Sequence, residues 1–168
     1  MSRLTSTHFG VFVIFAAIYA AGTLALGNLP LGELQVKTGE IMTPLVALFG
    51  LASVLGLAFG QFIANMASPL GPLDLITPAI SLGALLVLRA LAKRSIFLGV
   101  AAYYLISSIW LSLLTSVVTG RSDAFVTSFA RQGIAMVIGL AVYFVVRSRM
   151  PTQGPAKLEQ ARATEASG

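Results

Sequence analysis

The sequence predicts an all-α integral membrane protein that crosses the bilayer several times, and three observations carry this prediction. Hydrophobic residues make up 57% of the 168 residues and charged residues only 10%, whereas soluble domains are about a quarter charged. The ionisable residues are also confined, since none lies between Ile41 and Leu73. The apolar runs are continuous, which excludes the short alternating segments of a membrane β-barrel.

The first apolar run covers residues 9–26. We expect it to be a retained helix, because the apolar core of a signal peptide would be shorter. Ala17, Ala21 and Ala25 recur at four-residue spacing and therefore share one face, where a partner helix can approach closely. On the residues alone, ordinary packing within the bundle is the simpler explanation of this line. Residues 27–38 are then predicted to be a loop.

The longest apolar run covers residues 41–67. A single helix of 27 residues would measure about 40 Å, against a hydrocarbon core of about 30 Å. Tilting of the helix absorbs such an excess. A turn at Phe49-Gly50-Leu51, between a short helix and a longer one, explains the length equally well. The sequence leaves both alternatives open.

The stretch of residues 68–72 contains two prolines and a glycine and predicts a turn. Thr77 and Pro78 resemble an N-cap and the first residue of a helix that runs to about Leu91. Asp74 would lie just before this helix, near the positive end of its dipole.

Two further spans are predicted over residues 96–119 and 125–146, the second interrupted by Arg131-Gln132. Residues 150–168 are rich in proline, glycine, alanine and charge, which is typical of a disordered tail. Residues 1–149 are therefore expected to form one transmembrane domain, followed by a cytoplasmic tail.

The basic residues predict the orientation. With six helices and a cytoplasmic N-terminus, eight basic residues lie inside and three outside, which agrees with the positive-inside rule. A five-helix topology with the N-terminus outside has the same ratio, because it exchanges Arg3 for Lys37. Six helices would place Glu40 and Asp74 together at the extracellular ends, and five would place them on opposite faces. The eight are Arg3, Arg89, Lys93, Arg94, Arg147, Arg149, Lys157 and Arg162, and the three are Lys37, Arg121 and Arg131.

Polar side chains gather at the borders of the long apolar run. Glu40 directly precedes the run and Asp74 follows it. Gln61 and Asn65 lie near its C-terminal end, one helical turn apart. Carboxylates and amides are costly at membrane depth, so this grouping predicts a binding site. The alternatives are that both carboxylates are solvated residues at helix starts and that both amides bond between helices.

No motif supports catalysis. The sequence has no cysteine and a single histidine, His8, so the two carboxylates make a poor metal or acid/base pair. It has no Walker A sequence, and we expect no ATP hydrolysis by this chain. Its net charge of +5 does not indicate nucleic-acid binding, because the basic residues stand mostly at the ends of apolar runs. Tyr103, Tyr104 and Trp110 are predicted to serve packing or the membrane interface. We expect neither a cofactor nor a metal.

Four segments of the long central stretch form a recognisable pattern: residues 31–40, which end in Glu40, residues 44–49, Ile63-Ala64-Asn65, and Ser68-Pro-Leu-Gly-Pro-Leu-Asp74. With them, the chain resembles the queuosine-precursor transporter (QueT-like) family, whose members are substrate-binding S components of energy-coupling factor (ECF) vitamin transporters. Gly139, Leu140 and Tyr143 in the last span also fit, and the resemblance covers residues 16–146.

The resemblance implies a bundle of six transmembrane helices in the cell membrane, with both termini in the cytoplasm and a ligand pocket near the extracellular face. It also implies a partner module of one membrane coupling protein and two ATPases. In such S components, small residues at four-residue spacing on the first helix form the docking face for the coupling protein, and Ala17 and Ala21 fit that role.

The ligand implied by the resemblance is a queuosine precursor, a 7-deazaguanine. Glu40 and then Asp74 are the candidate carboxylates, Asn65 and Gln61 are the candidate amides, and Gln132 is a further candidate from the last helix. The family has a glutamate near the position of Arg131-Gln132, so this chain has lost an acid and gained a base there. Arg131 favours a neutral precursor unless it pairs with a carboxylate. An S component for another small vitamin, or a membrane structural protein without a ligand, remain the alternatives.

Overall fold

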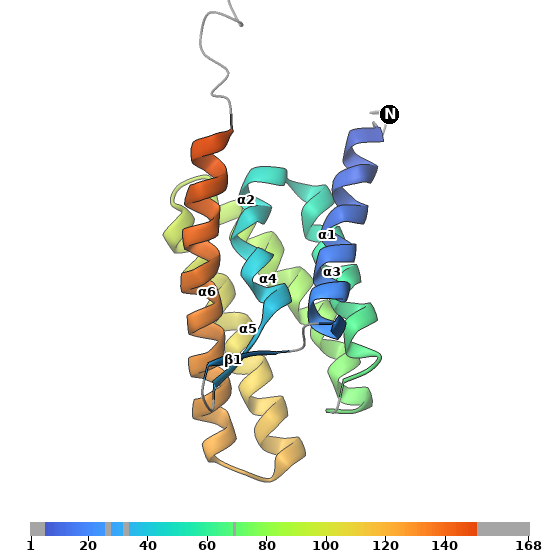
Figure 1. Ribbon diagram of the computed structural model, residues 1–168. Helices are drawn as coiled ribbons and strands as arrows, with labels where there is room; N and C mark the ends of the chain where they lie inside the picture. Colours follow the sequence, from blue (N-terminus) through green and yellow to red (C-terminus); the bar gives the residue numbers. More distant parts are fainter. Residues whose placement is uncertain (1–5, 26–27, 32–33, 69, 151–168) are drawn as a thin grey trace, which may run out of the picture.

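The computed structural model of the protein describes residues 6–25, 28–31, 34–68 and 70–150. They form helices joined by one short β-hairpin (Figure 1). In chain order the elements are α1 (Ser6–Ala25), β1 (Asn28–Leu31), β2 (Leu34–Lys37), the 3-10 helix η1 (Thr38–Leu45), α2 (Val46–Phe49), α3 (Leu51–Asn65), the 3-10 helix η2 (Pro72–Ile76), α4 (Thr77–Ala92), α5 (Ile96–Thr119) and α6 (Asp123–Arg149).

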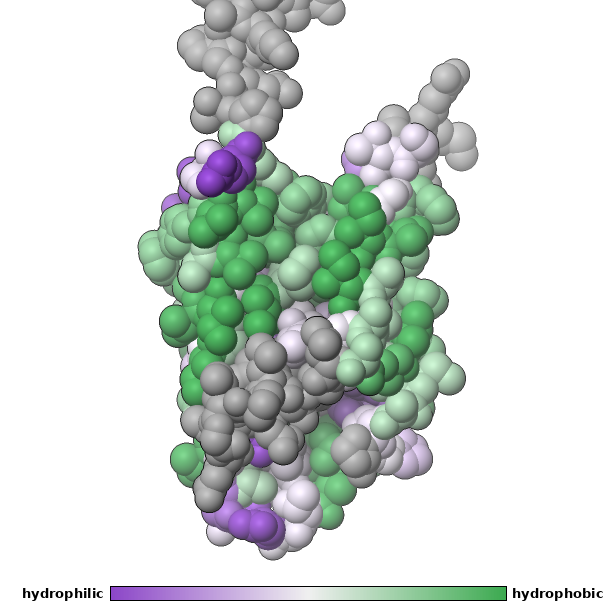
Figure 2. Space-filling view, in the orientation of Figure 1, coloured by the Kyte–Doolittle hydropathy of each residue, from purple (hydrophilic) through white to green (hydrophobic). Residues whose placement is uncertain are grey.

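The helices have the length and surface of membrane spans. Within the described residues, four stretches are long and apolar enough to cross a bilayer. They are α1, the continuous stretch formed by η2 and α4, then α5, and finally α6. Two shorter apolar helices accompany them. Large apolar side chains such as Val117 and Val137 are 74% and 69% exposed. Figure 2 shows hydrophobic surface over most of the height of the bundle and hydrophilic surface at its ends. Since an apolar exterior of this extent belongs in lipid, the protein is embedded in a membrane.

The long apolar run is broken at Gly50. This glycine has φ +76°, a conformation that is available to residues without a Cβ atom, and its N–H bonds the carbonyl of Val46 at 3.0 Å. The chain reverses there, so that α2 and α3 run in opposite directions (Figure 1). Of the two predicted alternatives, the turn between a short and a longer helix is therefore confirmed.

The predicted loop over residues 27–38 contains an antiparallel hairpin. Asn28 pairs with Lys37 and Leu31 with Leu34, so the prediction of a loop is wrong for these residues. The apolar residues at alternate positions, Leu34 and Val36, are the strand signal that was available in the sequence. The hairpin links α1 to η1, and β2 contacts α6.

One local prediction for the later helices is wrong. Thr77 is not an N-cap, because η2 runs directly into α4 and Ile76 before it already has helical angles. The predicted last span of residues 125–146 lies within α6, which continues from Asp123 to Arg149 through the polar pair Arg131-Gln132. The predicted span of residues 96–119 coincides with α5. The predicted tail lies outside the described residues except for Met150.

Glycines allow the closest helix contacts. A Cβ atom on Gly60 would lie 2.5 Å from the carbonyl oxygen of Ala16, and one on Gly139 would lie 2.7 Å from that of Ile41. Accordingly α1 packs mainly on α3, and α6 packs on η1 as well as on α5. Backbones that approach this closely gain dispersion contacts without a bulky side chain between them.

Both ends of the described chain lie on one side of the bundle (Figure 1). The hairpin, the α3–η2 turn and the α5–α6 turn lie toward the opposite side, which we refer to as the hairpin end. The C-terminal part of α1, the start of η1, the end of α3 and the start of α6 therefore meet at the hairpin end.

Candidate functional site

A buried carboxylate with two tyrosine partners lies at the hairpin end. Glu40 is 4% exposed. Tyr19 of α1 donates its hydroxyl to Oε1 at 3.0 Å, and Tyr103 of α5 donates its hydroxyl to Oε2 at 2.8 Å. Thr43 and Ser81 are buried beside the Tyr103 hydroxyl. We refer to these five residues as the Glu40 cluster, and their burial rules out the alternative of a solvated Glu40 at a helix start.

The position of Glu40 depends on the glycine before it. A Cβ atom on Gly39 would lie 2.8 Å from the ring of Tyr19, so only glycine lets η1 lie this close to α1. Thr38 adds a second link, because its hydroxyl donates to the carbonyl of Gly22 at 2.7 Å. These two contacts position the Glu40 carboxylate beside the Tyr19 hydroxyl.

The second carboxylate, Asp74, is fully buried. Thr77 donates its hydroxyl to Oδ1 at 2.6 Å, and Ser68 donates its hydroxyl to Oδ2 at 2.5 Å. Asn65 donates its amide to the Asp74 carbonyl at 2.9 Å, and Trp110 donates its indole N–H to the Thr77 hydroxyl at 2.9 Å. We refer to these five residues as the Asp74 cluster. Its hydrogen bonds join α3, η2, α4 and α5.

The two clusters are neighbours. Tyr19, which bonds Glu40, also lies within electrostatic range of Asp74. Among the residues whose side chains the structure describes, neither carboxylate forms an ion pair with a basic side chain. No three metal-binding side chains come together among the described residues.

Helix α6 adds polar atoms with unused bonding capacity. Gln132 is 5% exposed and donates its amide N–H to the Ser107 hydroxyl at 2.9 Å, while Ser107 donates to the carbonyl of Tyr103 at 2.7 Å. Among the residues whose side chains the structure describes, neither the buried amide oxygen of Gln132 nor the buried Nε of the neighbouring Arg131 has a hydrogen-bond partner. A buried acceptor and a buried donor are therefore available on α6.

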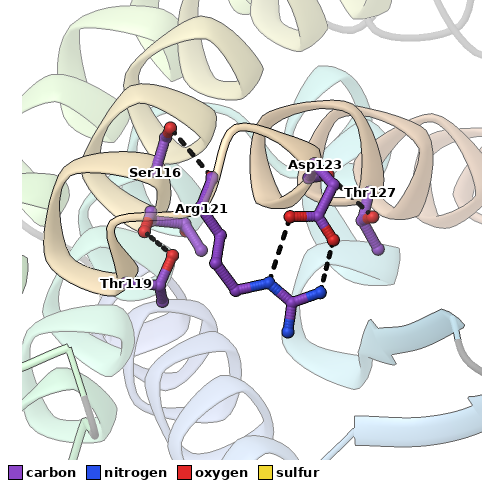
Figure 3. A network of polar contacts seen from close by, with 6 residues as sticks. Ser116, Thr119, Arg121, Asp123 and Thr127 are labelled. Carbon is purple, nitrogen blue, oxygen red and sulfur yellow. Dashed lines mark hydrogen bonds and ion pairs between the residues drawn. The ribbon is translucent and has the colours of Figure 1, made fainter.

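The acid and base at the α5–α6 turn are engaged with each other (Figure 3). Arg121 donates two N–H groups to the carboxylate of Asp123, which raises the pKa of Arg121 above its ordinary value. Ser116 donates to the backbone carbonyl of Arg121, and Thr127 donates to that of Asp123. This pair is exposed, so we do not include it in the candidate site.

A comparison with protein families decides the kind of protein. The family model described as QueT transporter matches residues 11–148, a stretch that includes both clusters and all of α3, α4 and α5. The chain belongs to the QueT transporter family. No curated protein and no solved structure matches the chain. Family membership makes this a membrane transport protein.

In this QueT-family protein the predicted ligand residues gather at one end. Glu40, Asp74 and Asn65 are buried in the two clusters, and Gln61 is buried one turn before Asn65 on α3. Asn65 links α3 to η2, which is the interhelical alternative considered for it. Gln132 and Arg131 come from α6, and their roles in ligand binding, like those of the other residues, stay predictions.

The predicted docking residues lie apart from the clusters. Ala17 and Ala21 are exposed on α1, whereas Ala16 and Ala20 beside them are buried. The carbonyl of Ala16 faces Gly60, so the buried line is the one that packs on α3. The exposed line is available to lipid or to another protein.

Sequence reasoning missed several residues of the site. The sequence predicts packing or the membrane interface for Tyr103 and Trp110, and it gives no site role to Tyr19, Ser68 or Thr77. The available signal was the hydroxyl or indole N–H of each side chain, because a buried tyrosine or tryptophan usually finds a hydrogen-bond partner. Tyr104 does match the packing prediction, since its hydroxyl donates to the carbonyl of Phe129.

Proposed function

We propose that this QueT-family protein is the substrate-capturing S component of an ECF-type importer and that it binds a 7-deazaguanine at the hairpin end. The observation that supports this most directly is the pair of buried carboxylates, Glu40 and Asp74. Each is held by hydroxyl donors, and neither forms an ion pair among the residues whose side chains the structure describes. We further propose six transmembrane passes, with both termini in the cytoplasm and the hairpin end facing outside.

The chemistry of a deazaguanine suits these groups. Its exocyclic amine adjoins a ring N–H, and a carboxylate can meet such a donor pair with two parallel hydrogen bonds. Each oxygen of Glu40 accepts one tyrosine hydroxyl, and a carboxylate has about four acceptor sites, so capacity for a ligand remains. The unpartnered amide oxygen of Gln132 is a candidate acceptor for a further ligand N–H.

Arg131 and the two buried carboxylates act in opposite directions on the charge of the ligand. Arg131 forms no ion pair among the residues whose side chains the structure describes, so by itself it favours a neutral precursor. Glu40 and Asp74 outnumber it, and for this reason the proposed ligand is the aminomethyl precursor, which carries a cation. A cationic aminomethyl group near Asp74 or Glu40 would offset the remaining negative charge, which is the main electrostatic cost of burying both groups.

Calorimetric titration of the purified protein with the aminomethyl, cyano and free-base precursors tests the ligand. Hydrogen bonds to a buried charged group contribute roughly 1.5–3 kcal/mol, and about 1.4 kcal/mol corresponds to tenfold in affinity. We therefore expect Glu40→Gln to weaken binding by about tenfold or more. Asp123→Asn is the matched control, because it neutralises an exposed carboxylate of the same helix bundle and should leave the affinity unchanged.

Two results would contradict the assignment. Equal affinity of the wild type and Glu40→Gln for every ligand that binds would remove Glu40 from the site. No binding of any deazaguanine would favour the alternative, an S component for another small vitamin or metabolite. The structural-protein alternative is set aside, because the chain belongs to a transporter family.

The proposed partners are a membrane coupling protein and two ATPase subunits, with docking through the exposed small residues of α1. Ala17→Trp or Ala21→Trp should reduce co-purification of the coupling protein, because a bulky side chain prevents close approach of the helices. Ligand affinity should stay unchanged, since both residues are exposed and outside the clusters. Ala141→Trp places the same side chain at an exposed position of α6 and serves as the control. Unchanged co-purification for both α1 variants would exclude this face.

A further inference from the structure

An apolar groove lies on the outside of the bundle, and none of its lining residues belongs to either carboxylate cluster. It is a groove of about 340 Å³ between α5 and α6, within the range of roughly 300–1,000 Å³ typical of small-molecule sites. We refer to it as the α5–α6 groove. The lining residues that matter here are Phe97, Ala101 and Tyr104 of α5 and Gly133, Val137 and Leu140 of α6.

Gly133 and Tyr104 form an apolar floor for the groove. A Cβ atom on Gly133 would lie 3.3 Å from the Tyr104 hydroxyl, so a larger residue would begin to fill the space. The Tyr104 hydroxyl is occupied, because it donates to the Phe129 carbonyl at 3.2 Å. Phe97 and Val137 are 60% and 69% exposed. The groove therefore suits a hydrocarbon chain better than a polar ligand.

One end of the groove meets a group of basic residues. The rings of Phe97 and Phe144 lie 5.8 Å apart, which brings the start of α5 beside the end of α6. Lys93 and Arg94 precede α5, while Arg147 and Arg149 end α6, and all four are exposed. None of them forms an ion pair within the described part of the chain. The positive first turn of α5 adds to their attraction for an anion.

The dimensions fit one leaflet of a bilayer. Tyr104 lies eight residues beyond Ile96, about 12 Å along a helix, which is within the half-thickness of about 15 Å of the hydrocarbon core. We propose that the α5–α6 groove binds one acyl chain of an anionic phospholipid, whose phosphate contacts the basic residues at the end of the groove. Basic pockets between transmembrane helices bind anionic headgroups by the same physics.

Native mass spectrometry of the purified full-length protein, with equal amounts of phosphatidylglycerol and phosphatidylcholine, tests the site. We expect at least threefold more phosphatidylglycerol to remain bound. Arg147→Gln combined with Arg149→Gln should bring the two lipids toward equal binding. Ala101→Leu should reduce phosphatidylglycerol binding at least threefold by filling the groove. Ala141→Leu, at an exposed position of α6 outside the groove, should not.

Several results would overturn the proposal. These are equal binding of both lipids by the wild type, a preference that persists in the double arginine variant, and equal effects of Ala101→Leu and Ala141→Leu. A protein occupant is tested with Ala101→Cys in this cysteine-free chain. If the coupling protein shields that thiol from a membrane-permeant maleimide in the assembled complex, the groove is a protein interface instead. Reaction at the same rate in the free and assembled protein is the result expected for a lipid site.

Discussion

Replacing Tyr103 with phenylalanine removes one hydroxyl from the Glu40 cluster and keeps the ring. That hydroxyl donates to Glu40 Oε2 at 2.8 Å, and Tyr103 is 2% exposed. Hydrogen bonds to charged groups contribute about 1.5–3 kcal/mol, and loss of one partner leaves the buried acceptor unsatisfied. We therefore expect Tyr103→Phe to lower the free energy of unfolding by about 1.5–3 kcal/mol.

Tyr104→Phe is the matched control for this prediction. Tyr104 also donates its hydroxyl, but to the neutral backbone carbonyl of Phe129 and at 3.2 Å. A hydrogen bond between neutral groups contributes only about 0.5–1.5 kcal/mol. Equilibrium unfolding of both variants in mixed micelles, followed by circular dichroism, measures the difference. A loss for Tyr103→Phe no larger than that for Tyr104→Phe would refute the reasoning that the carboxylate is the acceptor.

A double-mutant cycle isolates the contact itself. Glu40→Gln and Tyr103→Phe should couple by about 0.5–3 kcal/mol, the range for residues in direct contact. Tyr104→Phe should be additive with Glu40→Gln, because Tyr104 bonds a different acceptor. The same unfolding assay serves all the variants.

Two further predictions concern topology and packing. In this cysteine-free chain, an impermeant thiol reagent on intact cells should label Leu73→Cys and spare Lys93→Cys, and the reverse pattern would reject the proposed orientation. Gly60→Ala should destabilise the protein by about 1–3 kcal/mol through overpacking, because its Cβ atom would lie 2.5 Å from the Ala16 carbonyl oxygen. Gly83→Ala is the control, because a Cβ atom at Gly83 would meet nothing within 4 Å, and it should stabilise α4 by roughly 0.5–1 kcal/mol. Equal effects of the two substitutions in the unfolding assay would contradict this account of the α1–α3 contact.

The sequence by itself determined the membrane class and the outline of the helices. These follow from local properties, namely the length and hydrophobicity of each run and the prolines and glycines between runs. The span of residues 96–119, which coincides with α5, could be predicted for this reason. The polar borders of the long run were likewise visible, because carboxylates and amides beside apolar runs are conspicuous.

Only the tertiary structure decided which residues meet. Tyr19 and Tyr103 are 21 and 63 residues from Glu40 in the chain, and no local pattern pairs them with it. Their meeting depends on the reversal at Gly50 and on close backbone approaches at Gly39 and Gly60. Packing also decided that Ala16 faces α3 while Ala17 faces outward. The two rows of alanines on α1 have identical side chains, so the sequence cannot tell which row contacts α3.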